Sequence, residues 1–531
     1  MNKLLKDSFS IAIDNVIKYG DTDVFPFPIE NYMLFDEKEK ILKLLENIYN
    51  NFNNYITNTP PVFEKMLAPS GYTGFRWVTQ IDPILNVFLL GLVISISKEI
   101  EEHRVKKNNN CIFSYRIDID NDKATLFDTN FGWHKFQKNS LDLASKYKYV
   151  LSCDISNFYQ SIYHHRLDNA LKSLYVTDGN VIKYIMDIMQ NISNTKSYGL
   201  PIGGNAARIL AELLLDSTDK LLYSKDVKFC RFVDDYNIFA ETEQEIYSNL
   251  LYLSKILLEN EGFSLQKSKT KITTADEFIQ SSPINIEETN VTNSIFSISL
   301  KYDPYSSTAD EDYEKIKKEV RKIDIITLLT KELNKTKIHT DTLKRIIRLL
   351  KFSNKDTIDT CIEMLLNNII TLAPIFPNVM IIINNLFDNL SNNIQNMILD
   401  TIKRGIDTNE YIFKIDLNLM YTLRLLSKFP SVDNEKILAK IYSQTESKLI
   451  KKDIILIMSN WNANYWLSNL KNLYSNLSVW EKRCFILASY TLNDEGRHWR
   501  EHHKEGFNEI DIVYRDWRAS KCNVNGWRLP I

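Results

Sequence analysis

The spacing of apolar residues divides the chain into two parts. Before residue 263 there are short apolar runs typical of strands, such as YVLSC before Asp154, and ten of the 14 glycines fall there. From about residue 313 apolar residues recur every three or four positions, as at Leu343, Ile346 and Ile347, which places them on one face of a helix. We expect this second part to contain antiparallel helix pairs stacked as an irregular α-solenoid without a fixed repeat period.

Four short motifs occur in a fixed order in the first part. They read CDISNFYQSIYHH from Cys153, YGLPIGGNAARILAE from Tyr198, RFVDDYN from Arg231 and GFSLQKSKTKI from Gly262. Asp154 ends one apolar run, and Asp234 and Asp235 lie within another. Strands can bring such carboxylates together, and carboxylate oxygens are the ligands that Mg²⁺ prefers. Each motif alone is weakly specific, but the ordered set predicts a two-metal nucleotidyl transferase.

The ordered set resembles the palm of a reverse transcriptase. The resemblance implies an α+β right-hand polymerase followed by an all-α domain that replaces or extends the thumb. The expected domains are 1–140 for an N-terminal extension and fingers, 141–290 for the palm and 291–531 for the helical domain. Two Mg²⁺ ions, for which Mn²⁺ could substitute, are the implied cofactors. Their ligands would come from Asp154, Asp234, Asp235 and the adjoining Ile155.

The resemblance also assigns roles to residues around the carboxylates. Tyr159, five residues after Asp154, stands where reverse transcriptases carry a bulky residue that collides with a 2′-hydroxyl, which would select deoxynucleotides. An ordinary core aromatic beside Phe158 is the alternative. Lys269 could donate a proton to the departing pyrophosphate or pair with a phosphate. Pro201 and Gly203, in the Leu-Pro-x-Gly turn, are candidate nucleotide-binding residues.

Two arginines upstream of the palm are candidates for binding the incoming triphosphate. Arg76 lies in GYTGFRWVTQIDPILN and Arg116 in CIFSYRID, and each is next to aromatic residues in the sequence. A guanidinium group matches phosphate geometry well. Each arginine could instead form a structural pair with a nearby acid, such as Asp82 or Asp118, and the sequence favours neither reading.

The second motif departs from the usual reverse transcriptase pattern. Ile202 stands where many members carry Gln, a residue that supports the template strand. The LPIGG form, with the flanking TQIDPILN and FSYR segments, is similar to the defence-associated and abortive-infection reverse transcriptases of bacteria, which carry a helical C-terminal domain. The segments GDTDVFPFPIEN and EGRHWREHHKEGF suggest the second polymerase of the type 3 defence system within that group.

That resemblance implies anti-phage DNA synthesis that is independent of a template or unconventionally templated, with a protein tyrosine as a candidate primer. The implied partners are dNTPs, the DNA product, a non-coding RNA, a companion reverse transcriptase and further copies of the chain. Glu30 in FPFPIEN is a candidate base-reading residue, because a carboxylate can accept a hydrogen bond from a base amino group. The alternative for Glu30 is an exposed acid at a helix start.

Composition narrows the setting. The net charge of −2 over 531 residues is low for a protein that holds a long duplex, because phosphate contacts supply most non-specific affinity. Six cysteines without CxxC pairs suggest neither a zinc site nor a disulfide framework. The longest apolar run, ILNVFLLGLVISI from Ile84, is short for a bilayer and predicts a core helix. With no signal peptide in view, we expect a bacterial cytoplasmic protein without a membrane role.

Two other function classes remain open. Arg497 and His502 have the Arg-x-x-x-x-His spacing of HEPN ribonucleases, although the cluster RHWREHHK produces that spacing easily by chance. Packing around Trp499 or contact with nucleic-acid phosphate is the alternative. The other class is a degenerate polymerase that binds a phage component, which the intact carboxylates disfavour.

Overall fold

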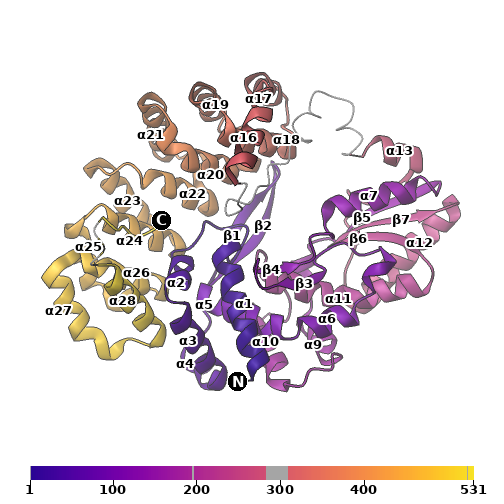
Figure 1. The fold of residues 1–531 in the computed structure, drawn as a ribbon, viewed down its shortest axis with the longest axis horizontal. Coiled ribbons are helices and arrows are strands. Elements are labelled where there is room, and N and C mark those ends of the chain that lie inside the picture. Colours follow the sequence, from indigo (N-terminus) through magenta and orange to yellow (C-terminus); the bar gives the residue numbers. More distant parts are fainter. Residues whose placement is uncertain (1, 194–195, 283–308, 523, 525) are drawn as a thin grey trace. The chain divides into compact units, whose positions relative to one another are not determined.

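The computed structural model describes residues 2–193, 196–282, 309–522, 524 and 526–531. They fold into two compact units (Figure 1). The first unit comprises residues 1–63 and 79–286, and the second comprises residues 64–78 and 287–531. A short segment near the N-terminus therefore belongs to the same unit as the C-terminal half.

A four-stranded antiparallel sheet forms the core of the first unit, with strand order β6–β7–β5–β8. Its strands are β5 (Tyr149–Asp154), β6 (Lys228–Phe232), β7 (Asp235–Ala240) and β8 (Lys271–Thr274). In the pair β5–β7, Tyr149 lies opposite Ala240 and Asp154 lies opposite Asp235. The end of β5 and the start of β7 therefore meet at one edge of the sheet.

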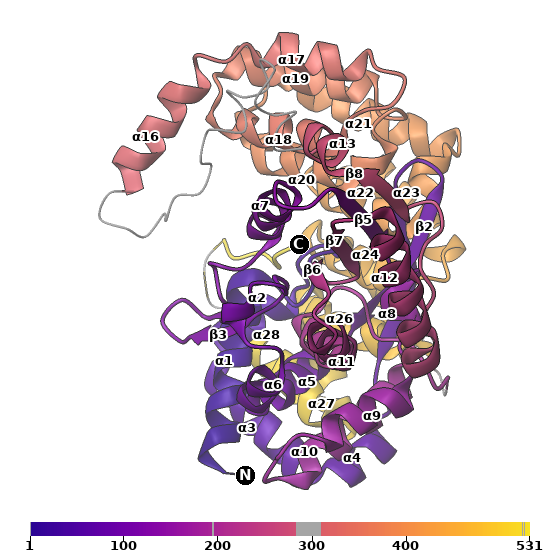
Figure 2. The ribbon, with the colours of Figure 1, turned by 90° about the vertical axis from the view of Figure 1, so that its right-hand side faces the viewer.

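Helices cover both faces of this sheet. Side chains alternate between the faces along a strand, so Val150 shares a face with Asp154, and Phe239 shares it with Asp235. That face packs against α7 (Trp133–Ala144) and α13 (Ala275–Gln280) in a core that contains Phe113, Phe136, Ala144, Val150, Cys230, Phe239 and Ala275. The other face meets α11 (Asn205–Ser224) and α12 (Glu243–Ile256), and both views place α7 and α12 on opposite sides of the strands (Figure 1, Figure 2).

The long apolar run near residue 90 forms the buried helix α5 (Pro83–Ser95), as its composition predicts. Asp82 caps the helix by accepting hydrogen bonds from the N–H groups of Ile84 and Leu85. α1 (Lys3–Tyr19) packs closely against it, and a Cβ at Gly91 would lie 2.0 Å from the Phe9 ring. No single helix among the described residues is long and apolar enough to cross a membrane. Only α5 together with α6 (Ser97–His103), bent by 50°, passes that test on length and composition.

Short helices and one small hairpin complete the first unit. The hairpin pairs β3 (Ile117–Asp120) with β4 (Thr125–Phe127). The remaining helices are α2 (Glu30–Asp36), α3 (Lys38–Asn50), α4 (Phe52–Asn58), α8 (Phe158–Ser161), α9 (His164–Lys172) and α10 (Gly179–Ile192).

The second unit is a stack of helices, as the sequence pattern predicts. Each helix from α17 to α24 packs against the helix two positions further along the chain or against its successor, the arrangement of an α-solenoid. The helices are α16 (Ala309–Val320), α17 (Ile325–Leu333), α18 (Thr340–Leu349), α19 (Lys355–Asn367), α20 (Phe376–Leu386), α21 (Asn392–Asp407), α22 (Asp416–Leu426), α23 (Val432–Gln444), α24 (Lys448–Asn460), α25 (Asn464–Asn472), α26 (Val479–Ala488), α27 (Asn493–His503) and α28 (Glu509–Lys521).

The hairpin β1 (Phe63–Ser70) and β2 (Gly74–Ile81) supplies residues 64–78 to this helical unit. The Glu64 carboxylate accepts hydrogen bonds from the N–H groups of Lys448 and Leu449, both at 3.1 Å, at the start of α24. The Tyr72 hydroxyl accepts a hydrogen bond from the Ile338 N–H at 3.1 Å. The same hydroxyl donates one to the Thr371 carbonyl at 3.2 Å. The first strand of the hairpin is therefore bonded to α24, and its turn to the segments before α18 and after α19, hundreds of residues later.

Candidate active site

The sheet brings the predicted carboxylates to one edge. β5 ends at Asp154 and β7 begins at Asp235, and these two residues form a cross-strand pair. Asp234 lies in the two-residue turn between β6 and β7. Its carbonyl accepts a hydrogen bond from the Ile155 N–H at 3.1 Å. The three aspartates and the backbone of Ile155 are thus neighbours.

Crowding of like charges makes this edge electrostatically unfavourable. Burial raises the pKa of Asp234 to about 7, and the charges of Asp154 and Asp235 add to that shift. Burial and Asp154 also raise the pKa of Asp235 to about 6, although Lys269 acts in the opposite direction. Asp234 and Asp235 therefore resist ionisation unless a cation compensates for their charge.

Lys269 supplies one such positive charge. Its Nζ donates a hydrogen bond to Asp154 Oδ2 at 2.7 Å, and this bond raises the pKa of the ammonium group. The side chain is 63% exposed, so solvent reaches it. A hydrogen bond of 2.7 Å from the Gln266 N–H to the Asp154 carbonyl holds the loop that carries the lysine beside β5. Lys269 can therefore meet either a carboxylate or a phosphate at this edge.

The donor chemistry of the carboxylates fits divalent metal ions. Mg²⁺ is bound through carboxylate oxygens together with water and substrate phosphates, so a protein need not enclose it. Among the described residues, no three His, Cys, Asp or Glu side chains converge closely enough to form a complete metal site by themselves. Asp154, Asp234 and Asp235 are the residues that could hold such ions, because a cation bound at this edge would offset their mutual repulsion.

The turn that carries Asp234 has an unusual backbone. Val233 has φ of +56°, a left-handed conformation that a β-branched residue rarely adopts. Two hydrogen bonds hold it there. Its N–H donates to Ser114 Oγ at 2.9 Å, and its carbonyl accepts from Arg231 Nη1 at 2.8 Å. Strain of this kind persists where the surroundings over-determine the backbone, which is common at active sites.

A buried ionic network lies beneath the turn, and sequence reasoning missed it. Arg231 is fully buried; its Nε donates to Asp219 Oδ1 at 2.8 Å and its Nη2 to Glu212 Oε2 at 2.9 Å. Glu212 also pairs with Arg104 and accepts a hydrogen bond from Ser114. Burial alone would raise the pKa of Glu212, but the two arginines hold it below its ordinary value. The sequence signal that could have indicated this network is a charged residue inside an apolar run, as at Arg231 in RFVDDYN and Glu212 in ARILAE.

A pocket of about 400 Å³ opens beside the carboxylates. Aromatic side chains of Trp133, Phe136 and Phe278 line it together with the cations of Lys269 and Lys271. Its other lining residues are Gln137, Ser152, Cys153, Asp154, Asp235, Tyr236, Asn237, Ser268, Ser281 and Ser282. Aromatic rings and polar or charged groups line the pocket together, and this volume suits one nucleoside-sized ligand.

Tyr159 lies within reach of the same turn. Burial raises its pKa well above the ordinary value for tyrosine, and Tyr115, Glu212 and Asp234 contribute in the same direction. Its carbonyl accepts a hydrogen bond from the Leu200 N–H at 2.8 Å, which joins the first motif to the second. The ring also stacks obliquely on Phe158, with centroids 5.2 Å apart. Tyr159 is therefore joined to the second motif, and its role as a sugar-contacting residue stays a prediction.

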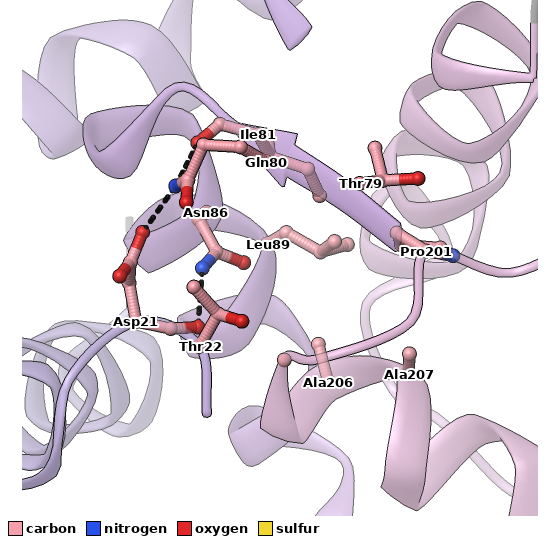
Figure 3. Close-up of a pocket in the computed structure, with 11 residues that line it drawn as sticks. Asp21, Thr22, Thr79, Gln80, Ile81, Asn86, Leu89, Pro201, Ala206 and Ala207 are labelled. Carbon is pink, nitrogen blue, oxygen red and sulfur yellow. Dashed lines mark hydrogen bonds between the residues drawn. The ribbon is translucent and has the colours of Figure 1, made fainter. Parts of the chain in front are cut away.

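The Leu-Pro-Ile-Gly turn packs against the N-terminal segment. Gly203 has φ of +124°, and a Cβ there would lie 2.4 Å from Thr22 Oγ1, so both backbone and space require glycine. Pro201 and Thr22 line a small pocket that also includes Asp21 and Asn86 (Figure 3). There Gln80 donates to Asp21 Oδ2 at 2.6 Å, and Asn86 donates to the Asp21 carbonyl at 2.9 Å. The pocket leaves about 10 Å³ free, roughly enough for one water molecule.

The two candidate triphosphate ligands lie in different environments. Arg116 is 2% exposed, pairs with Glu101 and donates to the Val105 carbonyl at 2.9 Å. Arg116 therefore forms a structural ion pair, and its acidic partner is Glu101 rather than Asp118. Arg76 is exposed on β2, in the hairpin that belongs to the helical unit. It remains a candidate for contacting an anion.

Glu30 begins α2, as a helix-start acid should, but it is only 1% exposed. The expectation of an exposed acid is therefore wrong. The helix places Glu30 on the side that also buries Asn31, Met33 and Leu34. A carboxylate in such surroundings needs hydrogen-bonding partners.

Arg497 and His502 do not converge. Both lie on α27, where Arg497 pairs with Asp494 at 2.9 Å and His502 is exposed. Five residues along a helix turn a side chain by roughly 140° relative to the first, so the two point in different directions. Trp499 is the packed residue of this helix, in contact with Tyr474, Phe485 and His503.

Comparison with known proteins identifies the same part of the chain. Residues 95–293 match the family described as "Reverse transcriptase (RNA-dependent DNA polymerase)". This span, less than half of the chain, contains the three aspartates, the Leu-Pro-Ile-Gly turn and Lys269. No curated protein matches the sequence.

Several solved structures are distantly similar. Telomerase from Candida albicans in complex with a TWJ fragment of telomeric RNA has 10% identity and a TM-score of 0.30, over 80% of this chain and 71% of that one. The corresponding Candida tropicalis complex has 12% identity and a TM-score of 0.30, over 75% and 68%. A truncated apo telomerase from Candida tropicalis has 13% identity and a TM-score of 0.28, over 43% of this chain and 55% of that one. This chain thus spans about half the length of the last, and at these scores nothing is inferred from the likeness.

Proposed function

We propose, for a chain whose residues 95–293 carry a reverse transcriptase domain, that it polymerises deoxynucleotides by two-metal nucleotidyl transfer in bacterial anti-phage defence. The observation that carries the catalytic part is the cross-strand pair of Asp154 and Asp235 with Asp234 in the adjoining turn. Three mutually repelling carboxylates at one sheet edge suit divalent cations that also bind phosphate.

The residues divide the chemistry between them. When bound, the ions lower the pKa of a primer hydroxyl and neutralise charge on the pyrophosphate. Asp154 and Asp234 would hold them, with Asp235 as a supporting carboxylate on β7. The exposed Lys269, which donates to Asp154 at 2.7 Å, would lose this partner if a cation took over that carboxylate. Its ammonium can then pair with the leaving phosphate or donate a proton to it.

The pocket beside the carboxylates and Tyr159 would position the reacting nucleotides. Trp133 and Phe278 offer aromatic surfaces on which a base can stack, and Lys271 offers a cation for its phosphate. Tyr159, near Asp234, would block a 2′-hydroxyl and so select deoxynucleotides. The rigid turn at Val233 keeps Asp234 in place between turnovers.

The defence role and the unusual templating are supported by sequence features. Ile202 replaces the Gln that supports a template strand in many reverse transcriptases. The net charge of −2 favours weak engagement of a long duplex. Synthesis with little or no external template, primed on a protein tyrosine, follows from the resemblance to defence-associated enzymes. A non-coding RNA, a companion reverse transcriptase, self-association and a cytoplasmic location belong to the same proposal.

The test is incorporation by the purified full-length protein. With Mg²⁺ and each labelled dNTP, in the absence of any template, we expect a polymer whose sequence can be read. Asp234→Asn should reduce incorporation by at least about 100-fold, because one neutral ligand cannot balance two divalent ions. Asp226→Asn is the control, since that aspartate is 86% exposed before β6 and pairs only with Lys228.

Near wild-type incorporation by Asp234→Asn would overturn the catalytic assignment. A parallel reaction with an RNA oligonucleotide decides the templating. Product that appears only with the RNA, and that is complementary to it, would refute template independence and leave the polymerase assignment intact.

A further inference from the structure

Two arginines of the helical unit stand around one tyrosine near the C-terminus. Arg500 of α27 stacks on Tyr490, with its guanidinium carbon 3.6 Å from the ring centre. Arg518 of α28 approaches the same ring at 5.8 Å. Tyr490 is fixed because its hydroxyl donates to the Arg515 carbonyl at 2.9 Å. Both guanidinium groups therefore approach the same ring, and that of Arg518 also lies 4.9 Å from the centre of the Trp527 ring.

Neither arginine has an acidic partner within the described part of the chain. Arg500 donates one hydrogen bond, to Ser489 Oγ at 3.0 Å, and Arg518 Nε is buried without a hydrogen-bond partner there. Three neighbouring arginines, by contrast, each pair with an acid: Arg483 with Asp511, Arg497 with Asp494 and Arg515 with Asp516. The missing partner is thus a local property of Arg500 and Arg518.

The two charges are costly in this arrangement. Burial lowers the pKa of both guanidinium groups, and the charge of Arg518 lowers that of Arg500 further. Tyr490 and Cys522 act on the pKa of Arg500 in the opposite direction, and the exposed carboxylate of Glu501 does so less strongly than Arg518 lowers it. Partly desolvated cations without counter-charge destabilise a fold. Both side chains are only partly buried, so an anion from solvent can reach them.

The chemistry of the pair selects phosphate. A guanidinium group offers a planar fork of donors that matches phosphate oxygens, and two forks together suit an anion with several such oxygens. Stacking on Tyr490 fixes the plane of the Arg500 fork, which reduces the entropy lost on binding. A small-molecule phosphate and the backbone of a nucleic-acid strand both present this chemistry.

We propose that Arg500 and Arg518, held by Tyr490, form a phosphate-binding site in the helical unit. It lies outside the reverse transcriptase domain, and its existence does not depend on the proposed polymerase activity. The site would give Arg500, one residue of the cluster RHWREHHK, a role other than in a nuclease.

The test uses the full-length protein in buffer with EDTA, so that metal-dependent binding at the palm does not contribute. Inorganic pyrophosphate should raise the melting temperature of the wild type, because it binds the folded state. Arg500→Gln and Arg518→Gln should each weaken this effect by about 10-fold in pyrophosphate concentration. Arg497→Gln, which removes an exposed arginine from the same helix, should leave it unchanged.

The melting temperature without anions separates loss of binding from loss of fold. Because each glutamine removes an uncompensated charge, we expect both variants to melt at the wild-type temperature or above it. Equal pyrophosphate responses in the wild type and both variants would overturn the proposal. So would an equal loss in Arg497→Gln, which would indicate a general charge effect.

Two further probes distinguish the sources of phosphate. If dATP competes with pyrophosphate and a 15-residue single-stranded DNA does not, the site takes a free nucleotide. If the DNA binds and its affinity falls in Arg500→Gln and Arg518→Gln, the site takes a strand, and the salt dependence of binding should fall by about one phosphate contact per variant. Binding of neither probe, together with no pyrophosphate response, contradicts the proposal.

Discussion

Asp234 lowers the stability of the metal-free protein at neutral pH because of the charges placed around it. Its carboxyl group is forced close to Asp154 and Asp235, and its pKa rises from the ordinary value of 3.8 to about 7. A carboxyl group whose pKa is raised on folding stabilises the protein below its unfolded-state pKa, and that contribution is lost as the pH rises through the folded-state value. Above about pH 7, Asp234 should therefore lower the free energy of unfolding of the metal-free protein.

Asp234→Asn should make the metal-free protein more stable at pH 8, by about 1–2 kcal/mol. This gain is smaller than the pKa shift of Asp234 alone implies. The neighbouring carboxyl groups titrate together with Asp234, and solvent screens part of their repulsion. At pH 5 the difference should be smaller, since wild-type Asp234 is then largely protonated. Urea denaturation in EDTA at both pH values measures it. An equal difference in the free energy of unfolding at pH 5 and pH 8 would contradict the electrostatic account. Mg²⁺ should reduce the difference between the variant and the wild type at pH 8, because it binds and stabilises the wild type.

Tyr159→Ala tests sugar selection at the residue scale. Removal of the ring near Asp234 should raise the ratio of ribonucleotide to deoxynucleotide incorporation by about 10-fold or more. Competition between labelled dATP and ATP measures the ratio. Tyr175→Ala is the control, because that tyrosine is 97% exposed. A wild type that uses both sugars equally would refute the gate.

At the scale of elements, the β6–β7 turn depends on the loop before β3. Ser114 is fully buried and links the Val233 N–H to Glu212. It therefore couples the strained turn to the ionic network around Arg231. Such networks are costly to break, because the remaining groups stay buried without partners.

Ser114→Ala should lower the free energy of unfolding by about 1–3 kcal/mol. It should also lower kcat by about 10-fold or more at conditions where the protein stays folded, since the Val233 N–H loses its acceptor and Asp234 loses its fixed position. Ser8→Ala is the matched control, because Ser8 is also buried but bonds only within α1, to the Leu4 carbonyl. Single-turnover kinetics and urea denaturation separate the two effects. A variant that loses stability but keeps full kcat would show that the turn is fixed by other contacts.

At the scale of the whole molecule, the segments of the two units are interleaved in the sequence. The hairpin at residues 64–78 lies between segments of the first unit in sequence but is bonded to the second. Glu64 binds the first N–H groups of α24, where an acid also meets the positive end of a helix. A change at the start of α24 should therefore also affect the hairpin, although the two are hundreds of residues apart in the chain.

Glu64→Gln with Tyr72→Phe should loosen the hairpin without unfolding the sheet. We expect hydrogen exchange at residues 64–78 and in the first turn of α24 to rise by about 10-fold, while β5 and β7 keep wild-type protection. Exchange followed by mass spectrometry measures both regions. Glu435→Gln is the control, since Glu435 bonds only the exposed Tyr465 within the helical unit. Unchanged protection of the hairpin would show that its apolar contacts alone hold it.

The sequence by itself determined the features that depend on local pattern. Short apolar runs predicted the strands that carry Asp154 and Asp235, and helical periodicity predicted the helical second half. The order of the motifs predicted that Asp154, Asp234 and Asp235 would meet, and β5 and β7 pair in the register that brings them together. Local pattern is enough here because periodicity and apolar run length depend on neighbouring residues alone.

The tertiary structure decided the features that depend on what lies opposite in space. Arg116 and Glu30 look like surface charges in sequence, yet both are buried, and the partner of Arg116 is Glu101. The left-handed Val233 depends on Ser114, and the position of the hairpin depends on α24. Whether a charge is buried, and which partner it meets, is set by residues distant in the chain, so no local window of sequence contains the answer.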